Sequence, residues 1–212
     1  MQKRDIRSYV IREGRMTPGQ KRALDEQWNS FGLNLEDGQL DVAFDKKADI
    51  VLEIGFGMGD SLFEMAQTFP EQNFIGVEVH RPGVGHLLQL SASHELKNLK
   101  VFRADSIDVL SLCIPDDSLS KVQIFFPDPW HKKKHNKRRL ITNEFVALVR
   151  EKLKPEGILH IATDWAPYAE VIAEVMQSWT PCGIPQRAET KYERRGLKLE
   201  HEVFDMAFKK SL

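Results

Sequence analysis

The sequence predicts an α/β fold built on a mostly parallel sheet. From residue 50 onward, short apolar runs rich in β-branched and aromatic residues alternate with amphipathic segments. This alternation is typical of strands joined by crossover helices. The chain has 212 residues, of which 42% are hydrophobic, enough to fill the core of one large domain. We expect that domain over residues 49–212, preceded by a basic, partly mobile extension over residues 1–48.

Five apolar runs predict the parallel strands in chain order: residues 49–57, 73–79, 99–105, 121–128 and 157–164. Between the first two, "SLFEMAQTF" places its apolar residues on one helical face, as a helix covering a sheet requires. Helices therefore fill the gaps between strands.

The two ends of the chain are less regular in pattern. Charges interspersed with Gly and Pro predict a single short helix near residues 19–30 within the extension. Near the carboxyl terminus, "TPCGIP" predicts a turn and "HEVFDMAFKK" a closing strand. The segment between them, "AETKYERRGLKLE", predicts an exposed loop.

Composition excludes several classes of protein. The net charge of -1 indicates no polyanionic partner by itself, so such a partner has to be inferred from local patches. Cys113 and Cys182 lie far apart without Cys-x-x-Cys spacing, which argues against a disulfide framework or a zinc site and fits a reducing, cytoplasmic compartment. The N-terminus lacks the apolar core of a secretory signal, and no run approaches the ~20 apolar residues that span a bilayer. We expect no membrane role.

Acidic residues and glycines gather at the predicted strand ends, where open parallel sheets bind ligands. "LEIGFGMGD" places Glu53 on the first strand and Gly55 and Gly57 in the turn after it, where missing side chains let the backbone approach a ligand. A tight turn without a ligand is the alternative. The Gly-x-Gly-x-Gly spacing differs from the Gly-x-Gly-x-x-Gly of dinucleotide folds. It resembles the first motif of S-adenosylmethionine-dependent methyltransferases.

Two further acids follow the next two strands. Glu78 lies about 20 residues after the glycines, where a carboxylate can accept both hydroxyls of a ribose. Asp105 follows the third strand and has two interpretations, which the sequence leaves open. It caps the next helix, or it contacts an adenine amino group, as a residue at this place in the methyltransferase fold usually does.

The fourth strand runs into "IFFPDPWHKKKHNKRR", residues 124–139. Pro127 and Pro129 restrict the chain around Asp128, and six of the eight residues at 132–139 are Lys or Arg with no acid among them. Blocks of like charge usually need an anionic partner, so the run favours RNA binding over an ordinary solvated surface. His131 and His135 have the spacing of metal ligands, but the basic run would repel a cation, and we expect no metal site.

These motifs together resemble one family. "FFPDPWHKKKHNKRR", "LEIGFGMGDS", "GVEVHRPGVG", "ATDWAPYAE" and "TKYERRG" are similar to the bacterial tRNA (guanine-N7-)-methyltransferases, over about residues 4–208. The resemblance implies a Rossmann-like class I S-adenosylmethionine-dependent methyltransferase, with a mostly parallel seven-stranded sheet flanked by helices. It also implies methyl transfer to N7 of the guanosine at position 46 in the tRNA variable loop.

The resemblance further assigns roles to individual residues. Contacts to S-adenosyl-L-methionine fall to Glu53, Gly55, Gly57, Glu78, Asp105 and Asp128, and Asp128 is also catalytic. Substrate contacts fall to Lys132, Asp164, Thr190, Lys191, Tyr192 and Glu193. RNA contacts fall to Lys134, His135, Asn136, Lys137, Arg138 and Arg139.

The chemistry of guanine suits an acid at residue 128. Guanine presents N1–H and an amine as donors, so Asp128 can accept from that edge while N7 points at the methyl group. Because N7 is already an unprotonated acceptor, the reaction needs positioning and charge stabilisation rather than a general base. A small-molecule methyltransferase and a non-catalytic RNA-binding module are the alternatives. The clustered acids argue against a degenerate pocket, since burying carboxylates is costly.

Overall fold

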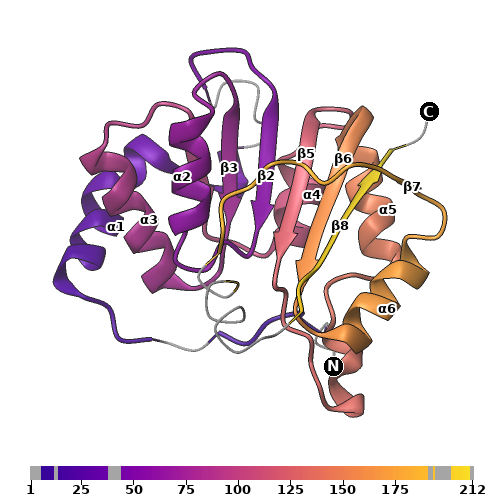
Figure 1. The fold of residues 1–212 in the computed structure, drawn as a ribbon. Helices are drawn as coiled ribbons and strands as arrows, with labels where there is room; N and C mark the ends of the chain where they lie inside the picture. The colour runs from indigo at the N-terminus through magenta and orange to yellow at the C-terminus, as the bar shows by residue number, and fades with distance from the viewer. Residues whose placement is uncertain (1–5, 12–13, 38–43, 191–192, 194–201, 211–212) are drawn as a thin grey trace.

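The computed structural model describes residues 6–11, 14–37, 44–190, 193 and 202–210. They form a sheet in the order β1-β4-β3-β2-β5-β6-β8-β7 (Figure 1). The first six strands in this order, from β1 at the edge to β6, are parallel to one another. The last two pairings are antiparallel, because β8 pairs antiparallel with β6 and β7 pairs antiparallel with β8. Their bounds are Gly32–Leu33 (β1), Ile50–Ile54 (β2), Asn73–Val77 (β3), Leu99–Phe102 (β4), Leu119–Phe125 (β5), Leu153–Thr163 (β6), Thr180–Pro181 (β7) and Phe204–Lys209 (β8).

The predicted α/β class is confirmed, with one difference in the sheet. The described residues contain eight strands, where the family resemblance implied seven. Six of them correspond to the five parallel runs and the closing strand predicted from the sequence, and the two-residue strands β1 and β7 pair at the two edges of the sheet. β7 lies in the segment predicted as a turn. Strands this short carry no alternating pattern, so the sequence offered no signal for them.

Helices cover both faces of the sheet (Figure 1), and the sheet separates two apolar cores. One core packs beneath α1–α3 and the other beneath α4–α6, as expected for a parallel sheet with crossover helices. The bounds are Pro18–Phe31 (α1), Asp60–Thr68 (α2), Arg81–Ser93 (α3), Ser106–Leu112 (α4), Asn143–Lys152 (α5) and Ala166–Val175 (α6), with 3-10 helices at Leu35–Asp37 (η1) and Lys133–Arg138 (η3). Among the described residues, no helix is long and apolar enough to cross a membrane.

The predicted N-terminal helix is confirmed as α1. It begins with a reciprocal capping box between Thr17 and Gln20 and has Pro18 in its first turn. It packs closely on α3, where a Cβ on Gly85 would lie 2.6 Å from the Gln20 carbonyl oxygen. β1 then joins the sheet beside β4. The domain boundary at residue 48 and the mobility of the extension stay predictions.

The topology places the carboxyl ends of the parallel strands at one edge. β2 pairs with β3 on one side and with β5 on the other, so strand order reverses around it, which is where such sheets bind ligands. Each predicted parallel strand ran one to three residues past its actual end. The apolar pattern continues through residues such as Val79 and Phe126, which belong to the loops that form the site.

Candidate functional site

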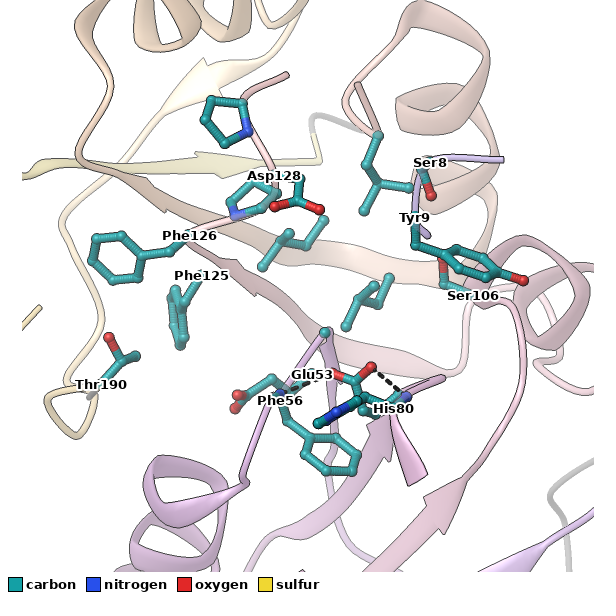
Figure 2. A pocket seen from close by; sticks show the side chains of 18 of the residues that line it. Ser8, Tyr9, Glu53, Phe56, His80, Ser106, Phe125, Phe126, Asp128 and Thr190 are labelled. Carbon is teal, nitrogen blue, oxygen red and sulfur yellow. Dashed lines mark hydrogen bonds between the residues drawn. The ribbon is translucent and has the colours of Figure 1, made fainter. Parts of the chain in front are cut away.

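A cavity of about 1110 Å³ lies beyond the carboxyl ends of β2, β3, β5 and β6 (Figure 2). In this view Asp128 lies across the cavity from Glu53 and Phe56, with Tyr9 and Ser106 toward one end and Thr190 toward the other. Several loops and the N-terminal segment therefore contribute walls.

The turn after β2 presents bare backbone to the cavity. Gly55 and Gly57 both line it with positive φ, 76° and 59°, and an added Cβ would meet no atom within 4 Å at either. The loop is held from behind by Gly83 at the start of α3, where a Cβ would lie 1.8 Å from the Gly57 carbonyl oxygen. The two predicted glycines thus form an open cradle rather than a turn packed against side chains.

Glu53 is a buried acid on the cavity wall. Only 2% of it is exposed, and one carboxylate oxygen accepts a 2.6 Å hydrogen bond from the Gln123 amide. The pKa of Glu53 is raised to about 7, because burial, the largest cause, and the nearby Glu78 outweigh the opposing effects of the Gln123 hydrogen bond and the Arg187 charge. Its protonation therefore changes near neutral pH.

Glu78 joins the loops that follow β2 and β3. One of its carboxylate oxygens accepts from the Gly57 N–H at 2.9 Å, and the other accepts from the Val79 and His80 N–H groups at 2.7 and 2.9 Å. A carboxylate has about four acceptor positions, so capacity remains for a further donor.

Asp105 is the N-cap of α4. Its side chain accepts from the Ile107 N–H at 3.0 Å and lies 3.2 Å from an Arg7 nitrogen. Its neighbours Ala104 and Ser106 line the cavity, but Asp105 is not among the lining residues. The capping interpretation is confirmed, and a contact to adenine stays a prediction.

Asp128 is exposed on the loop after β5 and lines the cavity. Phe126 and Trp130 bracket it with φ of 53° and 50°, a left-handed conformation that costs a non-glycine residue roughly 1–2 kcal/mol. The loop is tied on both sides. The Trp130 indole donates to the Ser8 carbonyl at 3.1 Å, and the Arg139 Nε donates to the Pro129 carbonyl at 2.9 Å.

The basic run forms η3 beside this loop. Lys132, Lys133, Lys134 and Lys137 are exposed. The two arginines turn inward instead: the Arg138 guanidinium lies 5.2 Å from the centre of the Trp130 ring, and that of Arg139 lies 4.8 Å from the Tyr168 ring. RNA contacts of residues 134–139 and the substrate contact of Lys132 stay predictions.

Aromatic residues missed by the sequence reasoning complete the wall near Asp164. Asp164 follows β6, and His131 and Trp165 meet edge to face with ring centroids 4.4 Å apart. All three line the cavity, as do Ser8 and Tyr9 from the N-terminal segment. In the sequence, the only sign that His131 and Trp165 belong to the site was their closeness to predicted site acids: His131 is three residues after Asp128, and Trp165 directly follows Asp164.

The segment after β7 departs from the expected exposed loop. Ala188 and Thr190 are buried, 8% and 7% exposed, and Thr190 lines the cavity. The prediction was wrong for these two residues because the Ala188 side chain packs into the core beneath α1–α3 and its N–H donates to the Met65 sulfur. Lys191 and Tyr192, predicted to contact substrate, lie outside the described residues.

Glu193 hydrogen-bonds Arg187 with both carboxylate oxygens. In the described part of the chain, no group of three His, Cys, Asp or Glu side chains is arranged to hold a metal ion.

Comparisons with known proteins agree with this geometry. A family model described as putative methyltransferase matches residues 47–206. The chain is 51% identical to a tRNA (guanine-N(7)-)-methyltransferase of Alcanivorax borkumensis, covering 98% of this chain and 92% of that protein. It is 52% identical to one of Saccharophagus degradans, covering 99% and 97%. The crystal structure of the 16S rRNA methyltransferase KamB shares the fold, with a TM-score of 0.58 and 15% identity over 96% and 99% of the two chains. The chain belongs to the tRNA (guanine-N(7)-)-methyltransferase family.

Proposed function

We propose that this protein transfers the methyl group of S-adenosylmethionine to N7 of a guanine in tRNA. The observation that carries the proposal is the cavity itself. Glu53 lies on one side of the cavity and Asp128 on the other (Figure 2). The open glycine turn lies on the Glu53 side, and the exposed lysines of η3 begin a few residues beyond Asp128. Position 46 as the target and a cytoplasmic location remain predictions.

The residues present fit the cofactor. Gly55 and Gly57 leave space for a ligand against the backbone, and Glu78 keeps acceptor capacity for ribose hydroxyls. Glu53 places a buried carboxylate at the inner wall, suited to a cationic ligand. When bound, S-adenosylmethionine supplies a methyl group on a positively charged sulfur, which an unprotonated ring nitrogen can attack.

The residues of this chain then have separate tasks. Asp128 accepts from guanine N1–H and the exocyclic amine, which orients N7 toward the inner wall. The positive φ values of Phe126 and Trp130 and the hydrogen bonds made by Trp130 and Arg139 restrict the backbone that carries Asp128 before substrate arrives. Such preorganisation stabilises the positive charge that develops on the base without rearrangement. The lysines of η3 attract the surrounding phosphates.

The test uses labelled S-adenosylmethionine, bulk tRNA, and strand scission after borohydride and aniline, which reports N7-methylguanosine. We expect scission with the parent protein. Asp128→Asn should lower the single-turnover rate by about 10²–10³ while tRNA affinity, carried mainly by phosphate contacts, changes little. Asp25→Asn, at an exposed acid of α1, is the matched control. No scission with the parent rejects the function, whereas a near-parental rate for Asp128→Asn removes only Asp128 from the mechanism.

A further inference from the structure

A buried arginine joins two carboxylates beside the cavity. The Arg187 side chain is 8% exposed, and its Nη2 donates to Asp205 at 2.6 Å and to Glu193 at 2.8 Å. Its Nε also donates to Asp205, at 2.9 Å. Burial, the largest influence, lowers the pKa of Arg187, but the two carboxylates outweigh it and the pKa is raised overall. The Arg187 guanidinium is therefore charged and bridges the carboxylates of Asp205 and Glu193.

One arm of this bridge is anchored in the sheet. The second oxygen of Asp205, on β8, lies 2.6 Å from Nε2 of His160, whose side chain is completely buried on β6. Hydrogen bonds to His160 and Arg187 outweigh burial and lower the pKa of Asp205, so this anchor is ionised. Two paired strands thus fix the position of the guanidinium.

The other arm holds a segment of the cavity wall. Glu193 and Thr190 cap each other: the Glu193 N–H donates to the Thr190 hydroxyl at 3.1 Å, and the Thr190 N–H donates to the Glu193 carboxylate at 3.4 Å. Thr190 lines the cavity. Arg187 also lies 5.0 Å from the ring centre of Phe125, another lining residue, at the start of the loop that carries Asp128.

We propose that Arg187 is a positioning residue for the tRNA side of the active site, resting on the proposed function. It holds Glu193, and through Glu193 the cavity-lining Thr190, beside β8 and Phe125, in the wall of the cavity that also contains Asp128. Buried ion pairs contribute little net stability compared with apolar packing of the same volume. The Nδ1 of His160 has no hydrogen-bond partner among the described residues, a further cost of this arrangement. The network is therefore better explained by the positioning of the cavity wall than by a contribution to the stability of the fold.

Arginine is required because its planar fork can hold Asp205 and Glu193 together. Lysine carries the same charge on a single compact ammonium and cannot reproduce both contacts in fixed directions. Arg187→Lys should therefore recover part of the function lost in Arg187→Met. This ordering separates a positioning role from a simple need for charge.

The experiment is a double-mutant cycle on Arg187→Met, Glu193→Gln and the combined variant, with Arg187→Lys alongside. Steady-state methylation of tRNA and calorimetric binding of S-adenosylmethionine are measured for each. Arg150→Met is the matched control, because the guanidinium of Arg150, on α5, lies 5.4 Å from the centre of the Trp179 ring and neither residue lines the cavity. Circular dichroism identifies variants that fail to fold, and for those Arg187→Lys and Asp205→Asn carry the test.

We expect kcat/KM for tRNA to fall on the order of 100-fold in Arg187→Met, the cost of misplacing a reacting group by about 1 Å. Cofactor affinity should fall much less than kcat/KM, because the loss of the Arg187 charge acts on the cofactor wall only by raising the pKa of Glu53. The combined variant should be no worse than the poorer single variant. A parental kcat/KM in Arg187→Met, additive effects, or an equal loss of cofactor affinity would each overturn the inference. An inactive parent would instead reject the proposed function.

Discussion

Replacing Glu53 with Gln should remove a large pH dependence of stability. Glu53 is buried on β2 and its pKa is raised from 4.5 to about 7, chiefly by burial. Glutamine has nearly the same shape, and its amide oxygen can still accept the 2.6 Å hydrogen bond from Gln123. The substitution therefore changes the titration of this site more than its packing.

The sign and size of the effect follow from linkage. Between pH 4.5 and about 7, the folded protein retains a proton on Glu53 that the unfolded chain has released. The parent protein therefore loses stability as the pH rises through this window, and the loss is complete above pH 7. A pKa raised to about 7 corresponds to roughly 3 kcal/mol of unfolding free energy between the two ends of the window.

The assay is urea unfolding of cofactor-free protein at a series of pH values across this window. The free energy of unfolding of Glu53→Gln minus that of the parent should rise by roughly 3 kcal/mol from the acid to the neutral end. Glu64→Gln, at an exposed acid of α2, is the matched control and should show no such trend. A difference that stays constant with pH would refute the inference that burial controls Glu53.

The remaining predictions concern RNA binding and the glycine turn. Replacing Lys133, Lys134 and Lys137 with Ala should weaken tRNA binding and reduce the slope of log affinity against log salt by about 0.7–0.9 for each phosphate that is no longer neutralised. The same change at Lys46, Lys47 and Lys97, which precede β2 and β4 at the opposite edge of the sheet, should not, and equal slopes would identify η3 as an ordinary solvated surface. Gly83→Ala should lower the thermal midpoint and cofactor affinity, because its Cβ would lie 1.8 Å from the Gly57 carbonyl oxygen. Gly183→Ala, where a Cβ meets nothing within 4 Å, should change neither the thermal midpoint nor the cofactor affinity. Parental values of both for Gly83→Ala would show that the glycine turn can move away from the added Cβ without loss of stability or binding.

The sequence by itself determined the fold class and the positions of most candidate site residues. Alternating apolar runs predicted strands that the structure confirms, and the carboxyl ends of parallel strands necessarily meet at one edge. Glu53, Asp128 and Asp164 could therefore be assigned to the same edge of the sheet from the sequence alone, and all three line the cavity. Periodicity and strand direction are local properties, so a local pattern is enough to read them.

The tertiary structure alone decided which residues face the cavity and which charges meet. Asp105 follows a strand as Glu78 does, yet it caps α4 and pairs with Arg7, which is 98 positions away in the chain. Ser8 reaches the Asp128 loop across a separation of 122 residues, through the Trp130 indole. The network of Arg187, Asp205 and His160 likewise joins a loop to two strands. Contacts between distant residues depend on how the chain packs, and no pattern within one segment encodes them.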